Sequence, residues 1–348
     1  MQVLGQTRSG KDCFRELLRG VNLTNLSAYL DSLRDGGESQ GAGGQFTIDP
    51  FKRQKKLQAF RMTRPEYCIL PIVSGAKLGG ATVIDVTGDL GDLNMRFDGR
   101  IWTYHDFPEL LSAGTQMARE FQTGLSAAQA LEPKQIVFLS RSGSLLSMLT
   151  IKDGTPSSSH REVEPSDEDF NWFEIQGSSV EAHTPIYQTL LDRCCYCPQV
   201  AWRGRRLLRK SPPSSAARLE LKDPALEQPS VVASAWTSVC IPNAGCSGHV
   251  WATDDAVNQF SFIINGITYP KEIKLGHYTG LHGVLTAPDL QLDISRENVV
   301  ESKAFQSLLQ LLKGYLDEKL MPKVKREYRL MMPLQRKTAD RLLKQWVK

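Results

Sequence analysis

The sequence predicts an α+β protein with mixed sheets. Stretches with apolar residues at helical spacing alternate along the chain with shorter runs rich in Val, Ile and Phe. No segment recurs at a fixed period, which argues against a solenoid or a propeller. At 348 residues, with 41% hydrophobic and 23% charged residues, the chain is long enough to bury a substantial core.

We expect residues 1–46 to hold an N-terminal helix over 12–34, followed by the flexible stretch "DGGESQGAGG". "GQTRSGKD", residues 5–12, has the spacing of a phosphate-binding loop, but Asp12 stands where that loop requires Ser or Thr for magnesium. We therefore interpret it as a polar segment that precedes the first helix.

Residues 47–210 are predicted to form the first large domain. "TRPE", residues 63–66, is typical of a helix start, because Thr63 can cap the helix and Pro65 suits its first turn. The apolar helix that follows contains Pro71, which we expect to remove a hydrogen bond and kink the helix, at a cost of about 3 kcal/mol in a helix interior. The other elements expected here are strands at 81–87 and 93–99, a mostly helical stretch at 107–131, two strands within 134–154, a polar loop at 154–169, a strand after it, a helix at 184–195 and a hairpin at 200–208.

Residues 211–229 read as a linker around one short strand, and residues 230–322 begin with strands and end in a helix with leucines at i, i+3 and i+4 spacing. Residues 323–348 form a basic C-terminal tail. Over residues 319–348, ten Lys and Arg residues stand against two acids, a net charge of +8, so the rest of the chain sums to −4. Such a tail attracts nucleic acid or acidic partners, and a solvated helix face is the alternative explanation.

Two segments of the chain carry a resemblance to a known family. They are "GGATVIDVTGDLGDLNMRFDGRIWTYHDFPELL" and "GLHGVLTAPDLQLDISRENVVES". The first resembles the Asp-Ala-Gly-Ala-Thr, strand, Asp-x-Gly-x-Gly stretch of GHKL ATPases, which include the ninety-kilodalton heat-shock chaperones, MutL, gyrase B and histidine kinases. The second resembles the chaperones' middle domain and the transducer domain of MutL.

The resemblance covers roughly residues 47–322, and the chain looks like a divergent class of bacterial chaperone-like proteins. It implies a Bergerat-type α/β sandwich followed by a transducer-like (ribosomal-protein-like) β-α domain. In active members, a Glu orients the attacking water and an Asn holds magnesium, because the charge of a triphosphate must be neutralised before attack. Aligned on "GGAT", Pro71 falls on that Glu, Gly75 on the Asn and Leu78 on the following Asp. The resemblance therefore implies a pseudo-ATPase with no catalytic residue and no metal.

The nucleotide-binding positions implied by the resemblance are also degenerate. In "FDGRI", Phe97 replaces the adenine-reading Asp, Gly99 is retained and Ile101 replaces the second glycine, while a slip of one residue offers Asp98 as the acceptor. Of the glycines of the phosphate lid, only Gly124 remains.

Arg296 matches the middle-domain arginine that, in the chaperones, reaches the terminal phosphate of the nucleotide. We expect Arg296 to form a structural salt bridge instead, with Asp293 or Glu297 as its partner. Together with Asp98, Gly99 and Gly124, Arg296 would then mark a vestigial nucleotide pocket.

Two further clusters have alternative interpretations. Cys194 and Cys197 form a C-x-x-C pair, and Cys240 with Cys246, or His249 as a substitute, would complete a zinc site; small buried thiols are the expected alternative. Arg203, Arg205 and Arg206, beside Trp202, suit contacts with nucleic acid, but alternate residues of a hairpin face opposite ways.

We expect a cytoplasmic protein without cofactors that binds another protein or serves as a structural subunit of a complex. No apolar run approaches the roughly 20 residues of a membrane span, and seven cysteines without an apparent export signal favour reduced thiols. One alternative is a divergent chaperone-like ATPase that binds ATP with Mg through Asp98 and Arg296. The other is an accessory protein that binds nucleic acid through the arginine hairpin and the basic tail.

Overall fold

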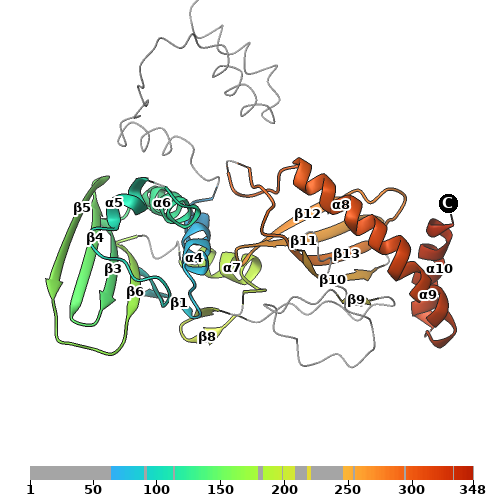
Figure 1. The fold of residues 1–348 in the computed structure, drawn as a ribbon, viewed down its shortest axis with the longest axis horizontal. Coiled ribbons are helices and arrows are strands. Elements are labelled where there is room, and N and C mark those ends of the chain that lie inside the picture. Colours follow the sequence, from blue (N-terminus) through green and yellow to red (C-terminus); the bar gives the residue numbers. More distant parts are fainter. Residues whose placement is uncertain are drawn as a thin grey trace, which may run out of the picture. The chain divides into compact units, whose positions relative to one another are not determined.

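Two β-sheets and the helices packed on them make up an α+β fold, which confirms the predicted class (Figure 1). The computed structural model describes residues 64–89, 92–112, 114–178, 183–197, 199–207, 218–220, 246–253, 255–293, 295–331 and 333–347. The predicted helix at 12–34, the segment at 5–12 and the cap Thr63 lie outside these residues.

The first sheet has eight strands in the order β5-β4-β3-β6-β2-β1-β7-β8. Neighbouring strands are antiparallel, except that β1 and β7 run parallel. The strands are β1 (Ile84–Asp89), β2 (Asp92–Phe97), β3 (Gln135–Ser142), β4 (Leu145–Lys152), β5 (Thr155–Glu162), β6 (Phe170–Gln176), β7 (Val200–Trp202) and β8 (Arg205–Arg206).

Helices cover the buried face of this sheet. Leu93, Met95 and Phe97 alternate along β2 and point into the core, as the period of a half-buried strand requires. The helices are η2 (Pro65–Cys68), α4 (Ile69–Leu78), α5 (Phe107–Ser112), α6 (Gln116–Ala128), η3 (Gln129–Leu131) and α7 (His183–Arg193). Within this group α4 and α5 both pack on α6, and α7 packs on η2.

Pro71 lies in the first turn of α4, not in the helix interior for which the loss of a hydrogen bond was expected. The chain starts as the 3₁₀ helix η2, with Pro65 at its first position, and becomes α-helical only at Ile69. The first four N–H groups of an α-helix have no partner within the helix, so a proline in the first turn removes no helical hydrogen bond. Pro71 is buried and contributes to the apolar face of α4.

The predicted polar loop at 154–169 is half strand, since Thr155–Glu162 form β5. β5 is the edge strand of the first sheet and pairs with β4 over its whole length. Because nearly all of its side chains are exposed, it lacks the apolar alternation that identifies a strand in a sequence.

The second sheet has the order β12-β11-β13-β10-β9, and only β11 and β13 run parallel. A two-residue turn, Asn265–Gly266 with φ values of 49° and 84°, joins β11 to β12, as expected for a tight hairpin. The strands are β9 (Arg218–Glu220), which lies in the predicted linker, β10 (Ser247–Ala252), β11 (Asn258–Ile264), β12 (Ile267–Ile273) and β13 (Leu281–Thr286).

The C-terminal helices follow the second sheet. Ser302 caps α8 through a hydrogen bond to the Phe305 N–H, and Phe305 packs edge-on against Phe262 of β11. The predicted basic tail is helical, because α8 continues through a π-helical turn into α9, and α10 follows. These elements are α8 (Lys303–Tyr315), η5 (Leu316–Leu320), α9 (Met321–Glu327), η6 (Tyr328–Leu330) and α10 (Pro333–Trp346). Buried residues of both sheets belong to one contiguous hydrophobic cluster.

Candidate functional site

The helices α4 and α6 touch at two glycines. A Cβ atom on Gly75 would lie 2.9 Å from a ring carbon of Phe121, and one on Gly124 would lie 2.3 Å from Cγ1 of Ile72. Separations this short are essentially never seen for real Cβ atoms, so only glycine permits this approach. Gly75, the implied magnesium position, therefore faces an aromatic ring. Gly124, the implied lid residue, lies within α6 rather than in a loop.

The "GGAT" and "FDGR" motifs are joined by the Asp98 carboxylate. It accepts hydrogen bonds from the backbone N–H groups of Thr82 (2.7 Å) and Val83 (2.9 Å) and from the Thr82 hydroxyl. Burial raises the pKa of Asp98, but these hydrogen bonds outweigh it and hold the pKa below its usual value. Asp98 thus links the turn after β2 to the segment between α4 and β1.

Gly99 allows the same two segments to come together. Its φ is +96°, and a Cβ atom there would lie 2.8 Å from the Gly79 carbonyl oxygen and from the Ala81 nitrogen. The Arg100 N–H donates to the Gly79 carbonyl at 2.8 Å. Gly99 is therefore required for backbone packing, which explains its presence without any ligand.

Five aromatic side chains fill the space between α6 and the sheet. Their ring centroids lie 5.8 to 6.4 Å from a neighbour's, and each is at most 3% exposed. This aromatic cluster consists of Phe97, Trp102, Phe107, Phe121 and Phe138. Phe97, which stands at the implied adenine-reading position, is thus a core residue, and such packed rings contribute dispersion and apolar burial.

A buried polar network, which sequence analysis missed, anchors the segment after Gly99. The Ser140 hydroxyl accepts from the Trp102 N–H at 2.7 Å and donates to Oδ1 of Asn171 at 2.8 Å. Nδ2 of Asn171 donates to the Arg100 carbonyl at 3.0 Å. A polar residue in each of two adjacent buried strands is the only signal of this network in the sequence.

Arg296 forms the expected structural salt bridge, but the predicted partners are wrong. Its guanidinium donates to the carboxylate of Glu120 on α6, whose side chain is 5% exposed against 24% for Arg296. Arg296 has a φ of 57°, an uncommon conformation for a non-glycine residue. The ion pair joins residues 176 positions apart and links the loop after β13 to a helix of the first sheet.

Asp293 shapes the loop that presents Arg296. Its carboxylate accepts from the Ser295 hydroxyl, from the N–H groups of Glu297 and Asn298, and from the Asn298 side chain. Burial raises the pKa of Asp293, and these hydrogen bonds more than offset it, so the pKa lies below its usual value.

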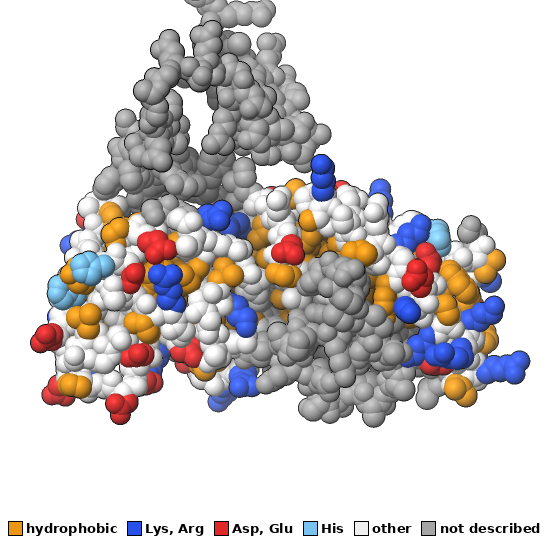
Figure 2. Space-filling view, viewed as in Figure 1, with side chains coloured by type: hydrophobic (Ala, Val, Ile, Leu, Met, Phe, Trp, Pro, Cys, Tyr) orange, Lys and Arg blue, Asp and Glu red, His pale blue; other side chains and the backbone are white. Residues whose placement is uncertain are grey.

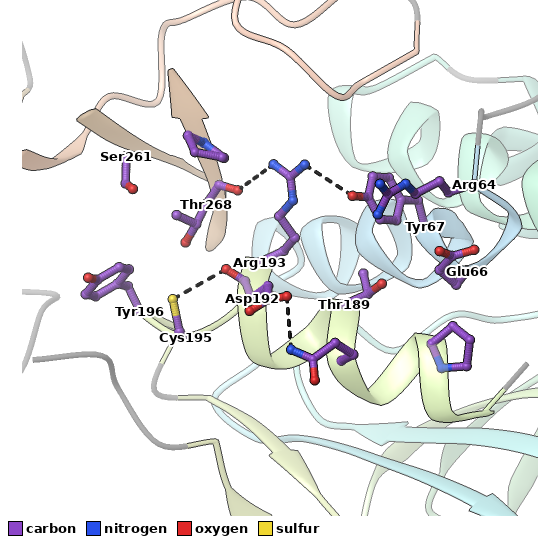
Figure 3. A pocket seen from close by; sticks show the side chains of 13 residues that line it. Arg64, Glu66, Tyr67, Thr189, Asp192, Arg193, Cys195, Tyr196, Ser261 and Thr268 are labelled. Atoms are coloured by element: carbon purple, nitrogen blue, oxygen red, sulfur yellow. Dashed lines mark hydrogen bonds between the residues drawn. The ribbon is translucent and has the colours of Figure 1, made fainter. Parts of the chain in front are cut away.

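A cavity of about 600 Å³ lies beside α7, at a place that no sequence motif indicated (Figure 3). Its walls come from one face of α7, from η2, from the residues after α7 and from the β11–β12 hairpin. The lining residues are Arg64, Glu66, Tyr67, Pro185, Gln188, Thr189, Asp192, Arg193, Cys195, Tyr196, Ser261, Thr268 and Pro270.

Arg193 is the central cation of this cavity (Figure 3). It donates to the Thr268 carbonyl at 3.2 Å and to the Tyr67 hydroxyl at 3.3 Å, and it lies over the rings of Tyr67 and Tyr269. Thr268 belongs to β12, an edge strand of the second sheet, so the guanidinium covers an edge carbonyl. Among the described residues, no carboxylate forms a salt bridge with Arg193.

A second cavity of about 320 Å³ adjoins the first, because Tyr196, Ser261 and Pro270 line both. It continues across β11, β12, β13 and β10, where Trp251 lines it. Burial, and to a lesser degree the nearby Cys195, raises the pKa of Tyr196 to about 12, so its phenol is protonated at neutral pH.

The five cysteines that the structure describes are buried, and the described part of the chain contains no group of three or more His, Cys, Asp or Glu side chains able to hold a metal. Cys194, Cys197 and Cys246 are among the buried thiols, and burial raises the pKa of Cys194 well above its usual value. Cys240 and the His249 side chain lie outside what the structure describes.

The predicted basic surfaces are partly used within the fold. Arg203 bonds through its guanidinium to the Gly88 carbonyl, which leaves Arg205 and Arg206 exposed on β8. In the C-terminal helices, Arg336 and Arg341 donate to backbone carbonyls. Other cations gather over α9 and α10 (Figure 2): Lys319, Lys325, Arg326, Arg329, Lys337 and Lys344 are exposed.

No protein-family model matches the chain, and a comparison with curated proteins finds no match either. Within the described residues, no helix has the length and apolar character needed to cross a membrane.

Proposed function

We propose that the chain is a non-catalytic relative of the GHKL ATPases, with a Bergerat-type first domain and a transducer-like second domain, that binds another protein in the cytoplasm. The packing of α4 against α6 carries the proposal. The positions that would hold magnesium and the lid are the two glycines that seat Phe121 and Ile72.

The charged residues support the same proposal. Asp98 has its carboxylate occupied by Thr82 and Val83, and Arg296 faces Glu120 instead of an open site. A guanidinium already neutralised by a buried carboxylate contributes little to phosphate binding, because the phosphate would have to displace that carboxylate first.

Isothermal titration calorimetry with Mg-ATP tests the proposal. We expect no heat of binding up to about 1 mM nucleotide, the range of very weak complexes. Micromolar binding that disappears in Asp98→Asn or Arg296→Gln would overturn the proposal in favour of a divergent chaperone-like ATPase that uses ATP with Mg.

A second candidate function, binding of nucleic acid, rests on the exposed cations of α9 and α10 (Figure 2). Phosphate contacts would make the affinity fall steeply with added salt. Binding of an oligonucleotide that is insensitive to salt, or unchanged in Arg326→Gln and Arg329→Gln, would exclude this candidate.

A further inference from the structure

The cavity beside α7 contains a partly buried cation that lacks an anionic partner. A guanidinium has five N–H donors, and Arg193 uses one on Thr268 and one on Tyr67. Within the described residues, its remaining donors have no acceptor. A charge held away from bulk water without a counter-ion is unfavourable, so a bound carboxylate would stabilise this site.

A second cation lies at the same aromatic ring. The guanidinium carbon of Arg64 lies 5.5 Å from the centroid of Tyr67, and that of Arg193 lies 5.3 Å from it. Arg64 is exposed and forms no salt bridge with a described residue. Tyr67 therefore has two guanidinium groups around its ring, each able to bind a carboxylate in a planar, bidentate geometry.

The other charges of the cavity narrow the class of ligand. Glu66 and Asp192 also line it, so the cavity holds acids as well as arginines. These carboxylates would repel a polyphosphate more strongly than a ligand with a single carboxylate and otherwise neutral polar groups. Gln188, Thr189 and Ser261 supply neutral hydrogen-bonding side chains for such a ligand.

The shape favours an extended chain over a compact molecule. The two cavities share Tyr196, Ser261 and Pro270, so they lie next to each other, and together we call them the groove. Tyr196, which is only partly buried, lines both cavities, and tyrosine and arginine are among the residue types that dominate protein-binding hot spots.

We propose that this groove binds an extended peptide segment of a partner protein, with an Asp or Glu side chain of that segment placed on Arg193. The proposal rests on the protein-binding role argued above and gives that role a location and a ligand chemistry. The carboxylate pairs with Arg193, Arg64 adds positive charge beside Tyr67, and the flanking peptide residues lie along Tyr196.

A peptide library tests the proposal with the full chain. The probes are random octapeptides, acetylated and amidated at their ends, with Asp, Glu, Asn or Gln fixed at the fourth position. We expect the acidic peptides to bind about 10- to 100-fold more tightly than the amide peptides, the usual range for a charge-assisted pair. Arg193→Gln should abolish this preference, and Arg161→Gln, which removes an exposed guanidinium from β5, should not change it.

Arg64→Gln covers the case that Arg193→Gln misfolds, because Arg64 is exposed and its side chain bonds to no described residue. We expect this variant to bind acidic peptides several-fold more weakly and to unfold at the same temperature as the unmodified protein. Equal binding of acidic and amide peptides, no binding at all, or a preference that survives both arginine variants would overturn the proposal. If N-acetylaspartate amide alone binds as tightly as the acidic octapeptides, the ligand is a small carboxylate and the peptide proposal is overturned.

Calorimetry with Mg-ATP on the same sample separates the two proposals. If the protein binds no nucleotide and shows no preference for acidic peptides, the groove proposal fails and the pseudo-ATPase proposal stands. If it binds nucleotide and its preference for acidic peptides depends on Arg193, the pseudo-ATPase proposal fails and the groove proposal stands.

Discussion

Polar groups in and around the α4–α6 contact have more hydrogen-bonding and charged partners than those in the cavity beside α7. At the contact, glycines let the helices touch and Glu120 pairs with Arg296, and in the sheet that α6 covers Asp98 and Ser140 each have partners within the fold. In the cavity, Arg193 lacks an anion, and the Thr268 hydroxyl has no partner among the described residues. The guanidinium that a ligand would satisfy thus lies beside α7, whereas the family resemblance points to α4. The variants below test how firmly the first region is held together, and the last pair compares the two regions directly.

The largest expected effect comes from breaking the buried ion pair of Arg296. Glu120→Ala leaves the guanidinium in a mostly buried site without its carboxylate, and removing one partner of a buried pair typically costs about 3–5 kcal/mol. Unfolding in urea measures the loss. The control is Glu168→Ala, which breaks the exposed Arg96–Glu168 pair and should cost less than about 1 kcal/mol.

The double variant Glu120→Leu with Arg296→Met sharpens this test. Replacing both partners by apolar side chains removes the uncompensated charge, so most of the stability should return. If Glu120→Ala and Glu168→Ala cost the same, the pair is solvated and does not hold the Arg296 loop against α6.

The next effect concerns the close approach of the two helices. Gly124→Ala places a Cβ atom 2.3 Å from Ile72, and overpacking of this kind typically costs about 1–3 kcal/mol. The matched control is Gly314→Ala in α8, where nothing lies within 4 Å and the higher helix propensity of alanine should add about 0.5–1 kcal/mol. Thermal unfolding should therefore shift in opposite directions. A stabilised Gly124→Ala would mean that the helices do not touch there.

The sequence could predict the elements that have strong local signals. The leucine spacing gave the helix after Ser302, and Pro65 gave the start of η2, because both patterns act within a turn or two. The short strand inside the predicted linker is β9. The exposed strand β5 was missed because a strand solvated on both faces leaves no period in the sequence.

The candidate site depends on contacts that no local pattern encodes. Glu120 and Arg296 meet across 176 residues, and their neighbours in the chain do not indicate the pairing. The cavity collects Tyr67, Arg193 and Thr268 from three separate elements, so its residues could be found only once the fold was known. Resemblance directed attention to Gly75 and Gly124 but could not show what they pack against.

A smaller effect appears in acid. The pKa values of Asp98 and Asp293 are lower in the folded chain than in the unfolded chain. Their contribution to the free energy of unfolding is therefore complete above the unfolded pKa of about 4 and is lost as the pH falls through the folded pKa. Asp98→Asn and Asp293→Asn should each destabilise at pH 7 and lose less stability than the unmodified protein between pH 5 and pH 3. Urea unfolding at several pH values measures this, and parallel pH curves for all three proteins would contradict it.

The last comparison concerns two buried hydroxyls, that of Ser140 and that of Thr268. Ser140→Ala removes a hydroxyl that bonds to Trp102 and Asn171 and should cost about 1–3 kcal/mol, because both partners lose a buried hydrogen bond. Thr268→Val removes a buried hydroxyl without a partner among the described residues, so the change should be close to neutral or slightly stabilising. Chemical denaturation of both variants at pH 7 gives the comparison. A loss for Thr268→Val as large as that for Ser140→Ala would mean that the cavity wall is as fully hydrogen-bonded as the α4–α6 region, and the contrast between them would disappear.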